Sequence, residues 1–262
     1  MLASQRHSSI VDLLREKGSV RVSELARTLD VSEMTIRRDL DTLSNRQLLE
    51  KVHGGATRTG ERSTHEPGFE LKQWRQLGSK DAIAGKAAER VLPGSAIGLT
   101  AGTTTWTLAK RLVAMPRLTV VTNSPSVAQV FYSALGNDLT VVLTGGIRTP
   151  SDALVGPLAT SALAKLHLDQ LFLGVHGMDA EHGYSTPNMA EAELNRAFVD
   201  SSREIIVLAD HSKWNVPGMA QISRLSRADS VISDRRLPAE AAVAFAEADV
   251  QLELVGASDQ EP

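Results

Sequence analysis

Three stripes of apolar residues at helical spacing dominate the first part of the chain. They are Ile10, Leu13 and Leu14; Val22, Leu25, Ala26 and Leu29; and Ile36, Leu40 and Leu43. Gly18 is typical of the end of the first helix, and Ser32 is a good N-cap for the third. Residues 48–57 then show the pattern of a strand, a Gly-Gly turn and a returning strand. Three helices followed by a hairpin predict a winged helix-turn-helix.

The rest of the chain alternates between short apolar runs and helical stretches. The strand-like runs are 96–99, 118–122, 139–144, 171–175, 204–209, 230–233 and 250–255. The helical stretches between them include 80–92, 103–113, 158–166, 191–201 and 239–248. This alternation predicts a three-layer α/β domain with a mostly parallel sheet. Ligands of such sheets bind beyond the carboxyl ends of the strands, so the residues that follow each strand are the functional candidates.

A polar stretch separates the two patterns. Residues 58–68 include two glycines, a proline and neighbouring hydroxyl residues, which is typical of a linker. The predicted organisation is therefore a winged helix-turn-helix at 1–58, a linker at 59–72 and an α/β effector-binding domain at 73–262.

Charge and composition narrow the function classes. The 262 residues include no cysteine, which excludes disulfides, thiolate zinc sites and a thiol nucleophile. The net charge of −3 divides unevenly: residues 1–62 carry 11 Lys and Arg against 9 Asp and Glu, and residues 63–262 carry 17 against 22. The first residues contain no apolar signal segment, and no apolar run is long enough to span a membrane. We expect a cytoplasmic protein without a membrane partner.

The outer face of the third helix has the residues expected of a DNA-recognition helix. With Ile36, Leu40 and Leu43 against the other helices, Met34, Arg38 and Asp41 point outward, with Thr35 and Arg37 beside them. Arginine can grip phosphate or pair with guanine in the major groove. The candidate DNA-binding residues are Arg21, Ser32, Met34, Thr35, Arg37, Arg38, Lys51 and His53, with Arg58 adding charge to the hairpin.

The alternative is an ordinary three-helix subdomain with a solvated arginine face. Asp39 and Asp41 favour that interpretation because they partly neutralise Arg37 and Arg38. Asp39 lies closer to the core side, so we expect it to be a structural partner that orients an arginine.

Small and hydroxyl residues follow successive strands of the second pattern. A glycine before a helix start, flanked by threonines, suits an anion such as phosphate. Asp210 and Lys213 follow a later strand and pair a cation with an acceptor. The candidate effector residues are Lys80, Gly102, Thr103, Thr104, Asn123, Gly145, Gly146, Glu191, Asp210 and Lys213. Each motif alone is equally typical of a tight turn or a solvated pair, so only their convergence at one sheet edge predicts a pocket.

The first part of the chain resembles the DeoR-type bacterial transcription regulators. The residues that carry the resemblance are Arg6, Ile10 and Leu14, the run Ser32-Glu33-Met34-Thr35-Ile36-Arg37-Arg38-Asp39-Leu40, and Val52-His53-Gly54-Gly55-Ala56. The resemblance implies that this region binds double-stranded operator DNA.

The second part resembles the sensor domain of the same family over nearly its full length from Lys80. The matching pieces are Lys80, Ile83-Ala84, Gly102-Thr103-Thr104, Val121-Thr122-Asn123-Ser124, Thr144-Gly145-Gly146, Asp169, Phe172, Gly174, Glu191-Ala192-Glu193, Asp210 and Ser212-Lys213. That domain is similar in fold to ribose-5-phosphate isomerase and CoA-transferase relatives. Two positions depart from the family pattern: Thr100 stands where the family usually has Asp, and Asn195 where it often has Lys.

The resemblance implies a repressor of a carbohydrate or polyol catabolism operon. The implied effector is a phosphorylated sugar or polyol, with its phosphate on the turn from Gly102 to Thr104 and with Asn123, Glu191 and Lys213 on the ligand side. We expect a homodimer or homotetramer, because paired helix-turn-helix domains match paired half-sites on DNA.

Enzymes are the alternative class. Gly98-Leu99-Thr100-Ala101-Gly102 has the spacing of a hydrolase nucleophile elbow, but threonine replaces the serine. A sugar-phosphate isomerase needs only a pocket and a carboxylate base, for which Glu191 or Asp210 would serve. A third class is an architectural DNA-binding protein without an effector. The histidines show no metal-binding spacing, so we expect neither a metal nor a cofactor.

Overall fold

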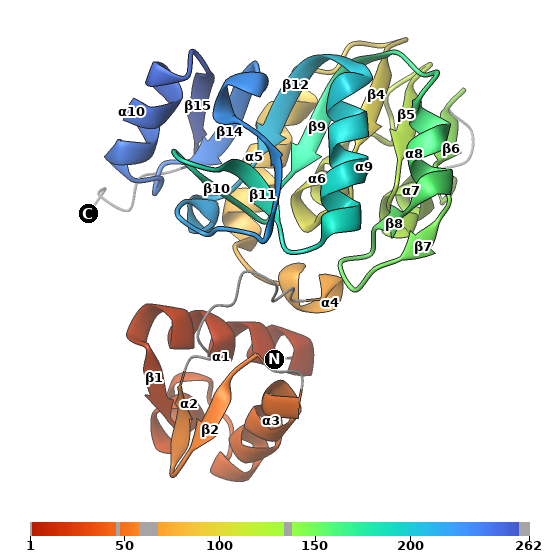
Figure 1. Ribbon diagram of the computed structural model, residues 1–262. Coiled ribbons are helices and arrows are strands. Elements are labelled where there is room, and N and C mark those ends of the chain that lie inside the picture. The colour runs from red at the N-terminus through yellow and green to blue at the C-terminus, as the bar shows by residue number, and fades with distance from the viewer. Residues whose placement is uncertain (1, 46–47, 58–67, 134–137, 257–262) are drawn as a thin grey trace. The chain divides into compact units, whose positions relative to one another are not determined.

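The computed structural model describes residues 2–45, 48–57, 68–133 and 138–256. The chain divides into two compact units, Met1–Arg75 and Gln76–Pro262 (Figure 1). Each unit has its own apolar core. No helix within the described ranges is long and apolar enough to cross a membrane.

The first unit is a winged helix-turn-helix, as predicted. Its helices are α1 (Ala3–Lys17), α2 (Val22–Thr28) and α3 (Glu33–Asn45). Strands β1 (Ser19–Arg21), β2 (Glu50–Val52) and β3 (Gly55–Thr57) form an antiparallel sheet in the order β1-β3-β2. The sequence pattern missed β1, because three residues are too few to display an alternation.

The end of the predicted linker is helical. Residues 58–67 lie outside the described part of the chain, and α4 (Phe69–Lys72) packs against α1 within the first unit. The boundary between the compact units falls after Arg75, whereas the sequence placed the start of the second domain at residue 73.

A buried carboxylate ties α3 to α1. Asp39 is 5% exposed, and its Oδ2 accepts a hydrogen bond from Arg6 Nε at 2.5 Å. The Nε2 of His7 lies 2.8 Å from the Oδ1 of Asp39. The hydrogen bond with Asp39 raises the pKa of Arg6. Asp39 is therefore a structural partner that orients an arginine, and this arginine comes from α1.

The hairpin turn needs both of its glycines. Gly54 has a φ of 77°, in the left-handed region that glycine adopts most readily. A Cβ on Gly55 would lie 2.1 Å from the carbonyl oxygen of Val20 on the paired strand β1. Gly55 thus allows the wing to close against the helical core.

The second unit is built on a seven-stranded parallel sheet in the order β15-β14-β12-β9-β4-β5-β6. These strands are β4 (Ala96–Leu99), β5 (Thr119–Thr122), β6 (Thr140–Leu143), β9 (Leu168–Gly174), β12 (Ser202–Leu208), β14 (Ser230–Asp234) and β15 (Gln251–Val255). Their order and direction confirm the predicted parallel α/β architecture.

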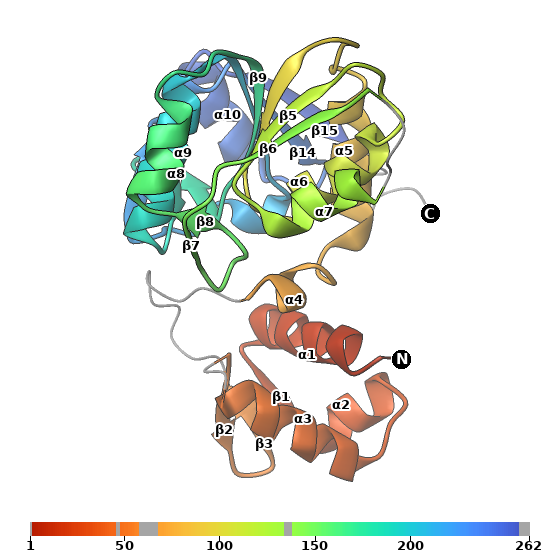
Figure 2. The same cartoon turned by 90° about the vertical axis from the view of Figure 1, so that its right-hand side faces the viewer.

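Helices cover both faces of this sheet (Figure 2). One face packs on α5 (Leu77–Ala88), α6 (Thr103–Leu112) and α7 (Pro125–Tyr132), and the other on α8 (Pro157–Leu163), α9 (Met189–Asp200) and α10 (Ala239–Glu247). Neighbouring residues of a strand enter opposite cores: Phe172 joins the first, and Leu171 and Leu173 join the second. The sheet is therefore the middle of three layers.

Short strands and turns of helix supplement the three layers. Strands β7 (Ile147–Arg148) and β8 (Leu154–Val155) form one antiparallel ribbon, and β10 (Gly177–Asp179), β11 (Gly183–Thr186) and β13 (Ala220–Ser223) form a small antiparallel sheet. Two 3₁₀ turns, η1 (His211–Lys213) and η2 (Leu225–Arg227), complete the unit. The sequence pattern did not predict α7, η1, η2 or these five strands, because all are too short for a clear period.

The chain order creates a switch point in the sheet. After β4 the chain adds β5 and β6 on one side, and it then returns to place β9 on the other side of β4. Ligands of open parallel sheets bind at such a switch point, outside the carboxyl ends of the strands. Here the switch lies between β4 and β9.

Replacing Asp39 with alanine should destabilise the first unit by about 3–5 kcal/mol, because it leaves the charge of Arg6 buried without its partner. Urea unfolding followed by circular dichroism measures the change. Asp41→Ala on the same helix is the control: Asp41 pairs with Lys51 at the surface, so we expect a loss below about 1 kcal/mol. Equal losses for the two variants would contradict the structural role of Asp39.

Candidate nucleic-acid interface and ligand site

Helix α3 presents its predicted outer face to solvent. Ile36, Leu40 and Leu43 are buried, whereas Met34, Arg37 and Arg38 are exposed. The Ser32 Oγ accepts a hydrogen bond from the Thr35 backbone N–H at 3.2 Å, which confirms the predicted N-cap. The start of this helix is therefore fixed next to the residues that would read DNA.

The charges on this face differ in how they are engaged. Arg37 pairs with Glu33 at 2.8 Å, one turn earlier, and Lys51 pairs with Asp41. Within the described ranges, the guanidinium of Arg38 makes no hydrogen bond or ion pair. Exposed pairs are worth little, so Arg37 and Lys51 can exchange their partners for phosphates. Arg38 needs no such exchange, which makes it the strongest candidate for a base or phosphate contact.

The wing adds further exposed polar groups. His53 lies in the turn between β2 and β3, and Arg21 ends β1 opposite Gly55. Both residues are exposed. Arg58 lies outside the described residues.

The loop after β4 is fixed by side chains from two strand ends and from the first turn of α6. The Thr100 Oγ1 accepts a hydrogen bond from the Gly174 N–H at 2.9 Å, so β4 and β9 are joined at the switch point. The Asn123 Oδ1 accepts one from the Ala101 N–H at 2.8 Å. Thr105 donates to the carbonyl oxygen of Thr100 at 2.7 Å. Asn123 therefore holds the turn in place, a role the sequence did not predict.

Gly102, Thr103 and Thr104 follow this fixed loop as the start of α6. The first backbone N–H groups of a helix have no partner within it, and the helix dipole places partial positive charge there. The hydroxyl groups of Thr103 and Thr104 add donors beside them, and both residues are largely buried. The turn that the sequence predicted to bind an anion is therefore the start of a helix, and it lies at the switch point of the sheet.

The charges of two lysines act on a buried carboxylate, Asp210, at the end of β12. Asp210 is 1% exposed and accepts hydrogen bonds from the Ser212 backbone N–H, at 3.0 Å, and hydroxyl. Burial on its own would raise the pKa of Asp210, but the charge of Lys213, the Ser212 hydrogen bond and the charge of Lys80 outweigh it and hold that pKa below its usual value. Lys80 and Lys213 thus act on one carboxylate although they are far apart in sequence.

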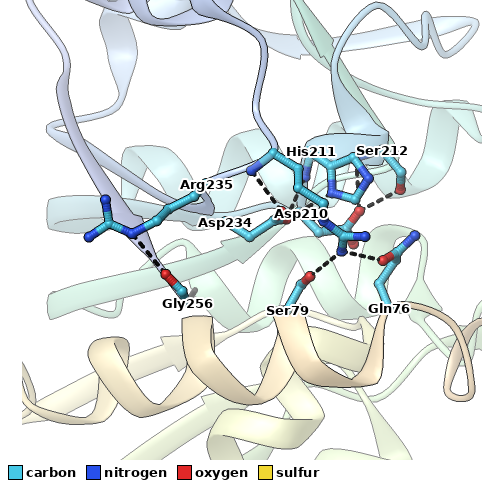
Figure 3. A network of polar contacts seen from close by, with 9 residues as sticks. Gln76, Ser79, Asp210, His211, Ser212, Asp234, Arg235 and Gly256 are labelled. Atoms are coloured by element: carbon cyan, nitrogen blue, oxygen red, sulfur yellow. Dashed lines mark hydrogen bonds and ion pairs between the residues drawn. The ribbon is translucent and has the colours of Figure 1, made fainter. Parts of the chain in front are cut away.

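A second carboxylate, Asp234, lies at the next strand end beside His211 (Figure 3). The Asp234 Oδ2 accepts a hydrogen bond from the His211 backbone N–H at 2.9 Å and lies 3.0 Å from the ring Nδ1 of His211. Burial would raise the pKa of Asp234, yet the hydrogen bonds from His211 and Arg236 hold it well below the usual range. The sequence did not single out Asp234 or Arg236, because they become neighbours of His211 only through the parallel pairing of β12 and β14.

Three side chains here are close enough together to hold a metal ion. The potential ligand atoms of Asp210, His211 and Asp234 lie within 4.8 Å of one another. The carboxylates of Asp210 and Asp234 already accept hydrogen bonds from Ser212, His211 and Arg236. The positive charges of Lys80 and Lys213 act on Asp210. These charges favour an anion over a metal cation at this end of the sheet.

Glu191 forms a second polar centre. It lies in the first turn of α9 and is 8% exposed. Its carboxylate accepts hydrogen bonds from three hydroxyl groups, those of Thr149 (2.5 Å), Ser151 and Thr186 (3.3 Å). The sequence predicted Glu191 but none of the three hydroxyl residues, since they belong to loops and a strand that pattern reading did not resolve.

The predicted site residues Gly145 and Gly146 lie just before strand β7. Gly146 has a φ of 116°, and a Cβ there would lie 2.4 Å from the carbonyl oxygen of Val155. It thus lets the β7–β8 ribbon close, whereas a Cβ on Gly145 would meet nothing within 4 Å. Asn195 is buried on α9.

Comparison with known proteins agrees with both units. The model of the DeoR-like helix-turn-helix domain matches residues 6–62, and that of the DeoR C-terminal sensor domain matches residues 75–235. The chain is 36% identical over 244 residues to the HTH-type transcriptional regulator GlpR of Haloferax volcanii, covering 92% of this chain and 93% of that one. It is 31% identical over 255 residues to the glycerol-3-phosphate regulon repressor of Escherichia coli K12, covering 97% and 100%.

Among solved structures, ribose 5-phosphate isomerase A of Methanocaldococcus jannaschii is 17% identical, with a TM-score of 0.38 over 52% of this chain and 54% of that one. That likeness is too weak to argue from. The two family models and the full-length relatives together show that this chain is a DNA-binding transcriptional regulator and belongs to the DeoR family.

Proposed function

We propose that this regulator represses an operon for carbohydrate or polyol catabolism, and that a phosphorylated sugar or polyol bound at the strand ends controls its affinity for operator DNA. The observation that carries the proposal is buried Asp210, on which the charges of Lys80 and Lys213 act, at the same sheet edge as the start of α6. A full-length relative is named a glycerol-3-phosphate regulon repressor, which supports the same effector class.

The ligand site has two ends of different chemistry. The cations and the N-terminus of α6 suit a phosphate group. At the second end, Glu191 and its hydroxyl partners Thr149 and Ser151 can exchange hydrogen bonds with the hydroxyl groups of a sugar or polyol. The switch point joins the two ends, because Thr100 and Gly174 connect β4 to β9. An elongated molecule with a phosphate at one end and hydroxyl groups along its length fits this arrangement.

The protein acts in the cytoplasm as a homodimer or homotetramer without catalysis. In such an oligomer, two DNA-binding units place their α3 helices on operator half-sites about one helical turn of DNA apart. The lowered pKa of Asp210 makes it a weak general base at neutral pH, which argues against the isomerase alternative.

Arg38→Ala should weaken binding to the operator by about 1–3 kcal/mol if the arginine reads a base. Operator DNA is first selected from a random duplex library with the wild-type protein, and fluorescence anisotropy then gives Kd at fixed salt. Lys165→Ala removes a cation from the exposed surface of the second unit and should leave Kd unchanged. Wild-type affinity in Arg38→Ala would remove this residue from the interface.

A sugar phosphate that binds the strand ends should raise the thermal stability of the protein. At 100 times its Kd a ligand stabilises the folded state by roughly 2.7 kcal/mol. The screen covers glycerol 3-phosphate, ribose 5-phosphate and several hexose phosphates, each beside its unphosphorylated counterpart. Shifts of the melting temperature only with the phosphorylated members support the proposal; no shift with any member, or equal shifts for both forms, contradicts it.

The double variant Thr103→Ala, Lys213→Ala should lose the effector response and keep its affinity for DNA. It removes one hydroxyl donor and one cation from the phosphate end. The measurement is the ratio of operator Kd values with and without the sugar phosphate found in the screen. The control is Lys86→Ala, on the surface of α5 beside Glu89. A wild-type ratio in the double variant would place the phosphate elsewhere.

A further inference from the structure

The second unit begins at a residue with an unusual backbone. Gln76 precedes α5 and has φ 49° and ψ 42°, in the left-handed region. Residues with a Cβ rarely adopt this conformation unless surrounding contacts hold them in it. The carbonyl oxygen of Gln76 accepts a hydrogen bond from the Lys80 N–H at 2.9 Å, which forms the first turn of α5. The preceding residue, Arg75, is the last of the first unit.

Arg236, from the C-terminal part of the chain, holds the first turn of α5. The Nη2 of Arg236 donates to the Gln76 Oε1 at 2.7 Å and to the Ser79 Oγ at 2.7 Å. The Nε of Arg236 donates to the Asp234 Oδ1 at 3.1 Å. A single guanidinium group therefore connects the end of β14 with the start of α5.

Asp234 extends the connection to the phosphate end of the ligand site. Its other oxygen, Oδ2, accepts a hydrogen bond from the backbone N–H of His211 and contacts the imidazole ring of the same residue. His211 follows Asp210, the carboxylate on which Lys80 and Lys213 act. We refer to Gln76, Ser79, His211, Asp234 and Arg236 together as the clamp.

Lys80 connects the first turn of α5 with the ligand site. It lies one helical turn after Gln76, so a shift of Lys80 moves the same turn of helix that Arg236 holds. A phosphate at the ligand site competes with Asp210 for the charge of Lys80 and Lys213. The two ends of the clamp thus respond to the same anion, one through Lys80 and the other through the loop that carries His211.

We infer that the clamp couples the ligand site to the chain segment that leads to the DNA-binding unit, with Asp234 and Arg236 as its positioning residues. Anion binding changes the first turn of α5, and this change reaches Gln76, where the chain passes into the first unit. This inference rests on the proposed function, since it assigns the route by which the effector alters DNA affinity.

The test compares Arg236→Ala with Arg235→Ala in the full-length protein. The Arg235 Nε donates to the carbonyl oxygen of Gly256 and takes no part in the clamp (Figure 3). The readout is the ratio of operator Kd values with and without glycerol 3-phosphate, or with and without the member of the sugar phosphate panel that shifts the melting temperature. We expect a ratio of about 5- to 150-fold in the wild type and in Arg235→Ala, and below about 2-fold in Arg236→Ala. The thermal shift with the same compound should persist in all three proteins.

Two further measurements keep the test decisive. Gln76→Ala removes one acceptor of Arg236 without touching the strand ends and should also lower the ratio, even if Arg236→Ala folds poorly. Hydrogen exchange without ligand should be faster in Arg236→Ala at the amides of both 77–81 and 211–213, and unchanged in Arg235→Ala.

The outcomes separate the two proposals. A wild type that responds to a sugar phosphate while Arg236→Ala and Gln76→Ala keep the full ratio overturns the clamp alone. Unchanged exchange at 77–81 in Arg236→Ala also overturns it. A wild type whose DNA affinity responds to no member of the panel overturns the proposed function, and the coupling role of the clamp with it.

Discussion

The burial of both faces of the parallel sheet governs where this regulator can carry its chemistry. In β9, Leu171, Phe172 and Leu173 are fully buried in turn on alternate faces, and the backbone pairs with β4 on one side and β12 on the other. A polar side chain in that position would lose its hydration without gaining a partner. The hydroxyl, amide and charged groups of the candidate ligand site lie at the strand ends, where loops and helix starts offer partners. Thr100, Asn123, Asp210 and Asp234 all lie there.

The same separation of polar from apolar groups operates in the smaller unit. Asp39 is a buried acid of α3, and Arg6 and His7 from α1 satisfy its oxygens inside the core. Because this carboxylate is engaged within the unit, it does not compete for the arginines on the outer face of the helix. A net charge near zero is then compatible with DNA binding, since the charges on one exposed face matter more than their sum.

Long periodic segments made the architecture predictable from the sequence. The three helices of the first unit, the seven parallel strands and the Ser32 cap follow from local spacing. The helix start at Thr103 does so as well. The clamp does not, because Gln76, His211 and Asp234 meet only through the order of strands in the sheet. Glu191 shows the intermediate case: its motif was recognisable, but its partners Thr149 and Ser151 come from a loop between two-residue strands.

The energetic scale of the clamp suits a switch. The side chain of Arg236 is 40% exposed, and ion pairs with that degree of hydration contribute about 0–1 kcal/mol each. Such contacts hold a left-handed residue such as Gln76 in place, yet they can rearrange when an anion draws Lys80 away from Asp210. A regulator needs a coupling free energy of only about 1–3 kcal/mol between its two sites. A fully buried ion pair at this position would fix the first turn of α5 too firmly for a small ligand to move it.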